Sequence, residues 1–316
     1  MDRTIKIGVS SCLLGNHVRY DGGHKLNRYV KDSLGEYFEY VPVCPEVECG
    51  LPIPREAMRL VGKPGNPRLM TIKTQIDLTD QMQKWGQNKL NELEDLHLSG
   101  YIFKSRSPSS GMERIKIYND QGNPVDYGSG IWARMFMDHF PLLPVEDEGR
   151  LNDPGLREHF IERVFVLWRW QELEGKYSNI NDLIDFHTRH KFLILAHSPQ
   201  LYSEMGYYVA NIKEKPRDHI FSGYFQLLDQ AMRIKTSVGK HINVLYHLLG
   251  FFKDKLESDE KQEIIEIIEH YRKGNFPLIV PITLINHFVR KYQETYLQNQ
   301  LYLQPHPIEL KLRNQA

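Results

Sequence analysis

The chain of 316 residues contains only three cysteines, Cys12, Cys44 and Cys49. So small and odd a number argues against a disulfide framework and makes the cytoplasm the simplest location. Neither sign of charge is in excess, because 40 lysines and arginines balance 40 aspartates and glutamates. No overall electric field therefore attracts nucleic acid, and any such binding has to come from a local surface.

Long apolar runs are also missing. Residues 1–6 are charged, and the apolar segment 7–9 is far too short for the core of a signal peptide. One of the longest apolar runs, residues 192–196, falls well short of the roughly 20 residues that a membrane-spanning helix needs. The sequence thus predicts neither a signal peptide nor a membrane partner.

Three short apolar segments in the first half, residues 5–10, 40–43 and 100–103, predict buried strands. Each runs into a loop of small or special residues, and residues 77–98 between the second and third predict a helix. Strand, loop, helix and strand in this order are typical of an α/β domain with a parallel sheet, whose ligands gather at the carboxyl ends of the strands. We therefore predict an α/β domain over residues 1–150 with its site at the strand ends.

The second half has only helical patterns. Residues 142–154 predict a linker, and helices are expected to start near Pro154, Asn181 and Ser258. Ser258 is a candidate N-cap, followed by an acidic first turn. We predict an all-α domain over residues 151–316.

Cys12 and Cys44 follow the first and second predicted strands. Thiols on neighbouring strand-end loops can lie close enough to share a metal. The alternative, that each is a small buried apolar residue, is common for free cysteines, and spacing alone gives the two interpretations equal weight.

Four motifs occur in the order found in the thiouracil desulfidase family: residues 8–15, 19–23, 43–55 and 104–111. The chain resembles this family over about residues 4–148. The resemblance implies a 4Fe–4S cluster that is held by three cysteines, two of them Cys12 and Cys44. One iron is left open for the sulfur of a thiolated uracil base or nucleotide, which water replaces with oxygen.

The third ligand position departs from the family. The family pattern is Ser-Pro-Ser-Cys-Gly, whereas residues 107–111 read Ser-Pro-Ser-Ser-Gly, which puts Ser110 at that position. A serine hydroxyl is a harder and poorer iron ligand than a thiolate. Either the chain is an engineered variant, or it has diverged naturally and Cys49 has taken over. We favour the first, with Cys49 outside the site.

Two residues match motif positions with catalytic roles in the family. Glu46 would be the acid or base beside the ring, and its alternative role is to cap the following turn. Ser107 would position substrate or water, and it could equally be a turn residue before Pro108. The motif resemblance places Glu46 ahead as catalytic and leaves Ser107 open.

Residues 181–308 resemble a second bacterial domain of unknown function that is found fused behind the desulfidase domain. The fused form implies 4-thiouridine in transfer RNA as substrate. Arg233, Lys235 and Lys240 lie in a basic stretch with interleaved aromatics, a composition that suits RNA; the alternative is a helix core with a solvated face. We predict an iron–sulfur-dependent 4-thiouracil or 4-thiouridine desulfidase, the rival being a non-enzymatic RNA-binding or regulatory protein with a degenerate cluster site.

Overall fold

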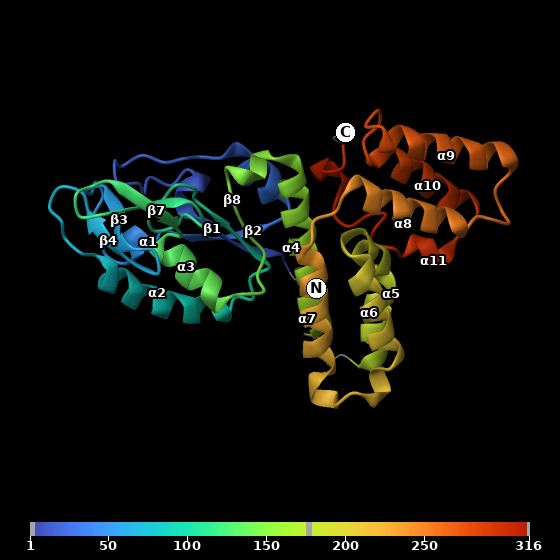
Figure 1. The fold of residues 1–316 in the computed structure, drawn as a ribbon, viewed down its shortest axis with the longest axis horizontal. Coiled ribbons are helices and arrows are strands. Elements are labelled where there is room, and N and C mark those ends of the chain that lie inside the picture. The colour runs from blue at the N-terminus through green and yellow to red at the C-terminus, as the bar shows by residue number, and fades with distance from the viewer. Residues whose placement is uncertain (1–3, 175–178, 315–316) are drawn as a thin grey trace. The chain divides into compact units, whose positions relative to one another are not determined.

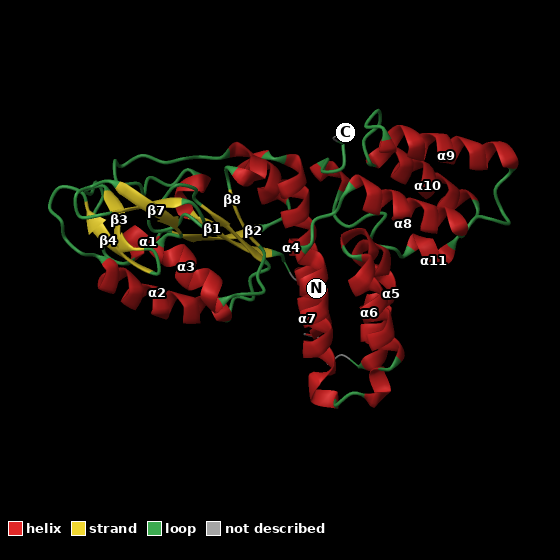
Figure 2. Cartoon of the chain, in the orientation of Figure 1, coloured by secondary structure: helices red, strands yellow, loops and turns green. Residues whose placement is uncertain are grey.

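The computed structural model describes residues 4–174 and 179–314. They form two compact units, one up to Phe160 and one from Ile161 onward. Figures 1 and 2 show that, in the described part of the chain, strands occur only in the first unit and the second is helical. This confirms the predicted fold class.

The first unit is built on a four-stranded sheet of order β2-β1-β5-β8 in which all neighbours are parallel. Its strands are β1 (Lys6–Ser10), β2 (Glu39–Val43), β5 (Gly100–Phe103) and β8 (Val145–Asp147). The first three agree with the predicted strands. Ser10 at the end of β1 pairs with Val43 at the end of β2, so the segments that carry Cys12 and Cys44 leave the same edge of the sheet.

β8 lies inside residues 142–154, where the sequence predicts a linker, so that prediction is wrong. The strand is only three residues long and carries Glu146 and Asp147, which gives it no apolar pattern. Arg150 stabilises both buried carboxylates: its Nε lies 2.6 Å from Glu146 Oε1, and its backbone N–H donates to Asp147 Oδ1 at 2.9 Å.

A second sheet of order β4-β3-β6-β7 was not predicted. It joins two antiparallel hairpins through a parallel pair of β3 and β6. Its strands are β3 (Met58–Lys63), β4 (Asn66–Thr71), β6 (Ile115–Tyr118) and β7 (Pro124–Gly128). Buried and exposed side chains alternate in β6, where Ile115 and Ile117 are buried and Lys116 is exposed.

The helices of the first unit are α1 (Pro45–Glu48), α2 (Thr79–Glu94) and α3 (Ile131–His139), with shorter turns η1 (Ser11–Leu14), η2 (Tyr29–Ser33), η3 (Leu34–Glu36) and η4 (Arg150–Asn152). α2 packs beside α3 (Figure 1). Trp132 and Phe136 of α3 contact Tyr101 of β5 in the core. α2 begins two residues later than predicted because Asp77 Oδ1 accepts the Thr79 N–H at 2.9 Å.

The second unit packs its helices around one apolar core. They are α4 (Pro154–Glu174, which begins in the first unit), α5 (Ile180–His197), α6 (Pro199–Ala210), α7 (Ile220–Arg233), α8 (Val238–Gly250), α9 (Ser258–Arg272), α10 (Ile279–Lys291) and α11 (Thr295–Gln298), with turns η5 (Ile212–Glu214), η6 (Arg217–His219) and η7 (Ile308–Leu310). The N-cap of α9 is Glu257, which forms a capping box with Glu260, and Ser258 is the first helical residue. None of the helices in the described ranges is both long and apolar enough to span a membrane.

Candidate functional site

A cavity of about 930 Å³ opens at the carboxyl ends of β1, β2 and β5. Cys12 enters it from η1, Cys44 from the N-cap position of α1, and the loop after β5 supplies Ser107 and Ser110. Together with Glu46, these five residues are the ones that the sequence singles out for the cluster and the chemistry, and all line this cavity. Cys49 is not among the described residues that line it.

Hydrogen bonds tie the third loop to the first loop and to α3. Ser10 Oγ accepts the Lys104 N–H at 2.8 Å, which links the first loop to the third. The third loop rests on the start of α3, because Ser109 O accepts the Ala133 N–H at 3.1 Å and Pro108 O accepts the Ile131 N–H at 3.2 Å. Gly130 permits this approach, since a Cβ there would clash with the Ser109 carbonyl. Ser107 and Ser110 are therefore held in place by rigid secondary structure.

The two cavity thiols are strongly perturbed. Burial, with a smaller effect of the Glu46 carboxylate, raises the pKa of Cys12 to about 11 and that of Cys44 to about 12. Each thiol keeps its proton at neutral pH unless a metal ion displaces it. With the Ser110 hydroxyl, the cavity offers two soft donors and one hard one, so it fits an iron–sulfur cluster at two of three positions.

Glu46 lies at the centre of a hydrogen-bond network. Ser109 Oγ donates to Glu46 Oε1, and Ser109 Oγ lies 2.8 Å from Ser107 Oγ. On the other side, Cys44 Sγ donates to Glu46 Oε2 at 3.4 Å, and Arg55 Nη2 lies 3.8 Å from the same oxygen. The network connects the two proposed catalytic residues through Ser109, which sequence analysis missed; the run of serines was its only signal.

The alternative role of Glu46, capping the turn after Cys44, is filled by another residue. Glu48 Oε1 accepts the Cys44 N–H at 2.8 Å, and Lys89 Nζ lies 3.0 Å from Glu48 Oε2. Ser107 combines both of its interpretations, because its Oγ accepts the Ser110 N–H at 3.1 Å while the residue lines the cavity.

The lining of the cavity is rich in cations. It contains Arg19, Lys25, Arg55, Lys104, Arg106, Arg114 and Arg150, against Glu46, Glu113 and Asp147. Some of these cations are already paired: Lys104 with Glu148, and Arg150 with Glu113 at 2.7 Å. Arg106 and Arg114 make no ion pair with any described residue. The cavity therefore suits an anionic substrate.

The basic residues proposed for RNA binding lie in the second unit and make internal contacts. Arg233 Nε lies 2.6 Å from Asp229 Oδ2. Lys240 Nζ donates to His197 O at 2.7 Å and to Lys235 O at 2.8 Å. Contacts with RNA would have to share or exchange these bonds.

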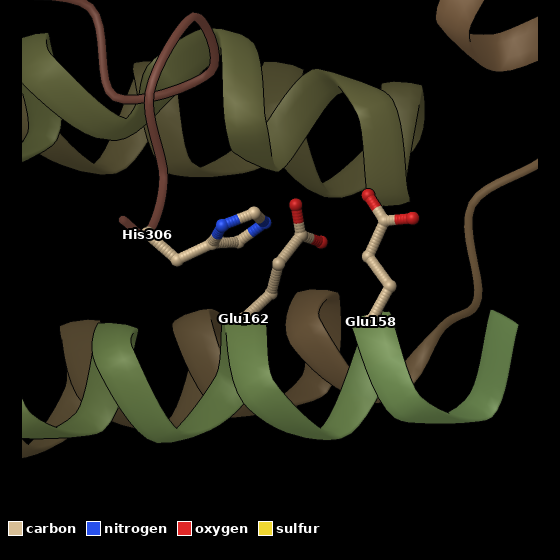
Figure 3. Close-up of side chains that lie close together, drawn as sticks. All are labelled: Glu158, Glu162 and His306. Atoms are coloured by element: carbon tan, nitrogen blue, oxygen red, sulfur yellow. The ribbon is translucent and has the colours of Figure 1, made fainter. Parts of the chain in front are cut away.

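Figure 3 shows another pair of potential ligands, Glu162 of α4 and His306, whose side chains face each other and are both buried. Both oxygens of Glu162 have partners: Arg313 Nη2 at 2.7 Å and His197 Nε2 at 3.3 Å. Burial tends to raise the pKa of Glu162, but Arg313 and His197 outweigh it and hold the pKa far below its usual range. We interpret Glu162, Arg313 and His197 as a buried ion-pair network.

The Glu162→Gln variant is expected to lower the free energy of unfolding by about 3–5 kcal/mol near neutral pH, because Arg313 then remains buried without its counter-charge. Since the folded pKa of Glu162 is depressed, its stabilisation is present above the ordinary carboxyl pKa and is lost as pH falls below it. Urea unfolding followed by circular dichroism at several pH values measures this. Glu263→Gln, at an exposed position of α9, is the control, and equal stability of the two variants would contradict the interpretation.

Two protein families match the chain. Residues 7–148 match the 2-thiouracil desulfurase family, and residues 191–307 match the DUF1722 family of proteins of unknown function. The Escherichia coli (strain K12) protein YbgA is 31% identical over 153 residues, which cover 48% of this chain and 90% of YbgA. The chain belongs to the YbgA family.

Two further relatives match about half of the chain. The Bacillus subtilis (strain 168) protein YbbK is 29% identical over 151 residues, covering 46% of this chain and 97% of YbbK. A solved structure of the [4Fe-4S]-dependent thiouracil desulfidase TudS shares 29% identity and covers 48% of this chain and 95% of its own, with a TM-score of 0.39. The segment that matches the 2-thiouracil desulfurase family, residues 7–148, contains Cys12, Cys44, Glu46 and Ser110.

Proposed function

We propose that the first unit is a desulfidase that replaces the sulfur of 4-thiouracil or 4-thiouridine with oxygen by hydrolysis. The observation that carries the proposal is the single cavity, within the segment that matches the desulfurase family, that Cys12, Cys44, Glu46 and Ser110 line together. Cys12 and Cys44 would hold a 4Fe–4S cluster, with Ser110 at the third ligand position. Such a cluster with an open iron supplies a Lewis acid that polarises a carbon–sulfur bond.

The chain's own residues supply the proton transfer and the positioning. Glu46 is the acid or base beside the ring, because its carboxylate lies in the cavity and is oriented by Ser109 and Arg55. Ser107 positions substrate or water and is coupled to Glu46 through Ser109. Ser110, a poor iron ligand, impairs this chain as written.

We further propose that the substrate is transfer RNA in the cytoplasm. The surplus of cations in the cavity and the fused DUF1722 domain with Arg233, Lys235 and Lys240 support this proposal. The hydroxyl at the third ligand position favours the rival, a non-enzymatic RNA-binding or regulatory protein with a degenerate cluster site.

Iron and sulfide content after anaerobic reconstitution, measured with turnover of 4-thiouracil and of thiolated transfer RNA, tests the proposal. A loaded cluster and release of sulfide from either substrate in the Ser110→Cys variant support the enzyme. Binding of transfer RNA by a protein that neither loads a cluster nor desulfurates any substrate in either form supports the rival.

Changing Arg233, Lys235 and Lys240 together to glutamine is expected to weaken binding of transfer RNA and to reduce the slope of log affinity against log salt by somewhat under one for each lost phosphate contact. Filter binding over a series of salt concentrations measures this. The matched control changes Lys261, Lys273 and Arg290, which are exposed in the same unit. If binding keeps its affinity and slope, the RNA surface lies elsewhere; if turnover of the free base collapses as well, these cations support the fold instead.

A further inference from the structure

A second cavity of about 550 Å³ lies over β3 and β6 of the second sheet. Four of its lining residues, Met58, Arg106, Pro108 and Arg114, also line the desulfidase cavity. These four shared residues place the two cavities side by side. A cavity of this volume can hold a group of roughly the size of a small organic ligand.

All charged residues that line the second cavity are basic. Arg59, Arg106, Arg114 and Lys116 line it, and none of its described lining residues is acidic. None of these four side chains forms an ion pair with a described residue. This differs from the desulfidase cavity, where Lys104 and Arg150 are neutralised by glutamates.

Arg59 is prepared for an anion. Its Nε is buried and has no hydrogen-bond partner in the described part of the protein, a costly state for a charged group. Its guanidinium lies 5.4 Å from the centroid of the Tyr118 ring, which fixes it against β6. Because Arg59 lines the second cavity, a phosphate bound there would offset the charge of this guanidinium.

The two arginines at the junction have unusual backbone conformations. Arg106 has a φ of 58° and Arg114 a φ of 54°, in the left-handed region that residues other than glycine rarely adopt. Such conformations are energetically costly and persist where the surrounding structure enforces them, often at functional sites. Here they occur at the two cations that both cavities share.

We infer that the second cavity binds the nucleotide next to the thiolated one in a single strand of RNA. Arg106 and Arg114 face the phosphodiester between the two nucleotides, Arg59 and Lys116 face the next phosphate, and the apolar lining, with Met58 and Ile72, contacts the base or sugar. The inference rests on the proposed function, because it requires the thiolated base to occupy the first cavity. It assigns recognition of a strand, as opposed to a free base, partly to the first unit.

The test uses the full chain as written and a fluorescein-labelled uridine trinucleotide, with binding followed by fluorescence anisotropy. The double variant Arg59→Gln/Lys116→Gln is expected to bind the trinucleotide about tenfold or more weakly, since each lost bond was to a charged group. The slope of log affinity against log salt should also become shallower. The affinity for uridine monophosphate, measured by competition, should fall less in the double variant, because that ligand reaches only the shared arginines Arg106 and Arg114. The matched control, Lys63→Gln/Lys73→Gln, removes two exposed charges that line neither cavity.

Unchanged affinity and salt slope in the double variant would overturn the inference, as would competition by polyglutamate equal to that by the RNA. A second measurement separates this from failure of the proposed function. In a Ser110→Cys background, the double variant should lower the ratio of kcat/KM for a 4-thiouridine trinucleotide to kcat/KM for 4-thiouracil. An unchanged ratio with normal turnover overturns the inference alone. Absent turnover with the expected loss of trinucleotide binding overturns the desulfidase and leaves the RNA site supported.

Discussion

Replacing Ser110 with cysteine is expected to convert a chain that loads little or no iron–sulfur cluster, and turns over little or no substrate, into a loaded and active one. Ser110 is 3% exposed and lines the same cavity as Cys12 and Cys44. A cysteine at this position would therefore place a third, equally buried thiol in the cavity. A thiolate is the donor that iron–sulfur clusters use, whereas a hydroxyl is harder and less acidic. Iron and sulfide analysis, the visible absorbance spectrum and turnover of 4-thiouracil measure the change.

The control for this experiment is Cys49→Ser. Cys49 Sγ donates to the backbone oxygen of Glu46 at 3.2 Å and does not line the cavity. In the Ser110→Cys background, loss of Cys49 should therefore leave cluster content unchanged. Full loading and activity of the chain as written would refute the ligand role of Ser110, and loss of the cluster in Cys49→Ser would assign the third ligand to Cys49.

The parallel sheet was predictable because its strands β1 and β5 are buried and its topology follows from strand, loop and helix order. The shared edge of β1 and β2 then brought Cys12 and Cys44 to one cavity, as expected for parallel strands. β8 escaped prediction since its buried carboxylates depend on Arg150, which the local sequence does not reveal. The second sheet was missed because the exposed residues and turn residues in its strands weaken any apolar pattern.

The finer parts of the site depend on contacts between distant segments. Ser109 can orient Glu46 because α3 supports the loop that carries Ser109. From the sequence alone, either Glu46 or Glu48 could cap the turn after Cys44, and only the side-chain geometry assigns this role to Glu48. Arg106 and Arg114 line the cavity with backbone conformations that arginine rarely adopts and that the sequence does not reveal. Motifs identified the chemistry, whereas the positioning groups around it required the structure.

Glu46→Gln, made in the Ser110→Cys background, is expected to lower kcat by about a hundred- to ten-thousandfold, the usual contribution of a general acid or base. The amide keeps the shape of the side chain, and its oxygen can still accept the Ser109 hydrogen bond, so cluster content should be unaffected. What is lost is the ability to take up and release a proton beside the ring. Single-turnover desulfidation of 4-thiouracil, with iron content measured in the same samples, separates the two effects.

Glu48→Gln is the matched control for Glu46→Gln. Glu48 lies on the same short helix and accepts the Cys44 N–H at 2.8 Å, so the change perturbs the same loop without removing a carboxylate from the cavity lining. A weakened cap costs about 1 kcal/mol of stability and should leave kcat within a few-fold. If both variants lose activity and cluster together, Glu46 supports the loop; if Glu46→Gln loads its cluster and turns over normally, proton transfer belongs to another group. A large loss of kcat confined to Glu46→Gln, at full iron content, would leave proton transfer by this carboxylate as the physical explanation, because charge, shape and loop support are then accounted for by the pair.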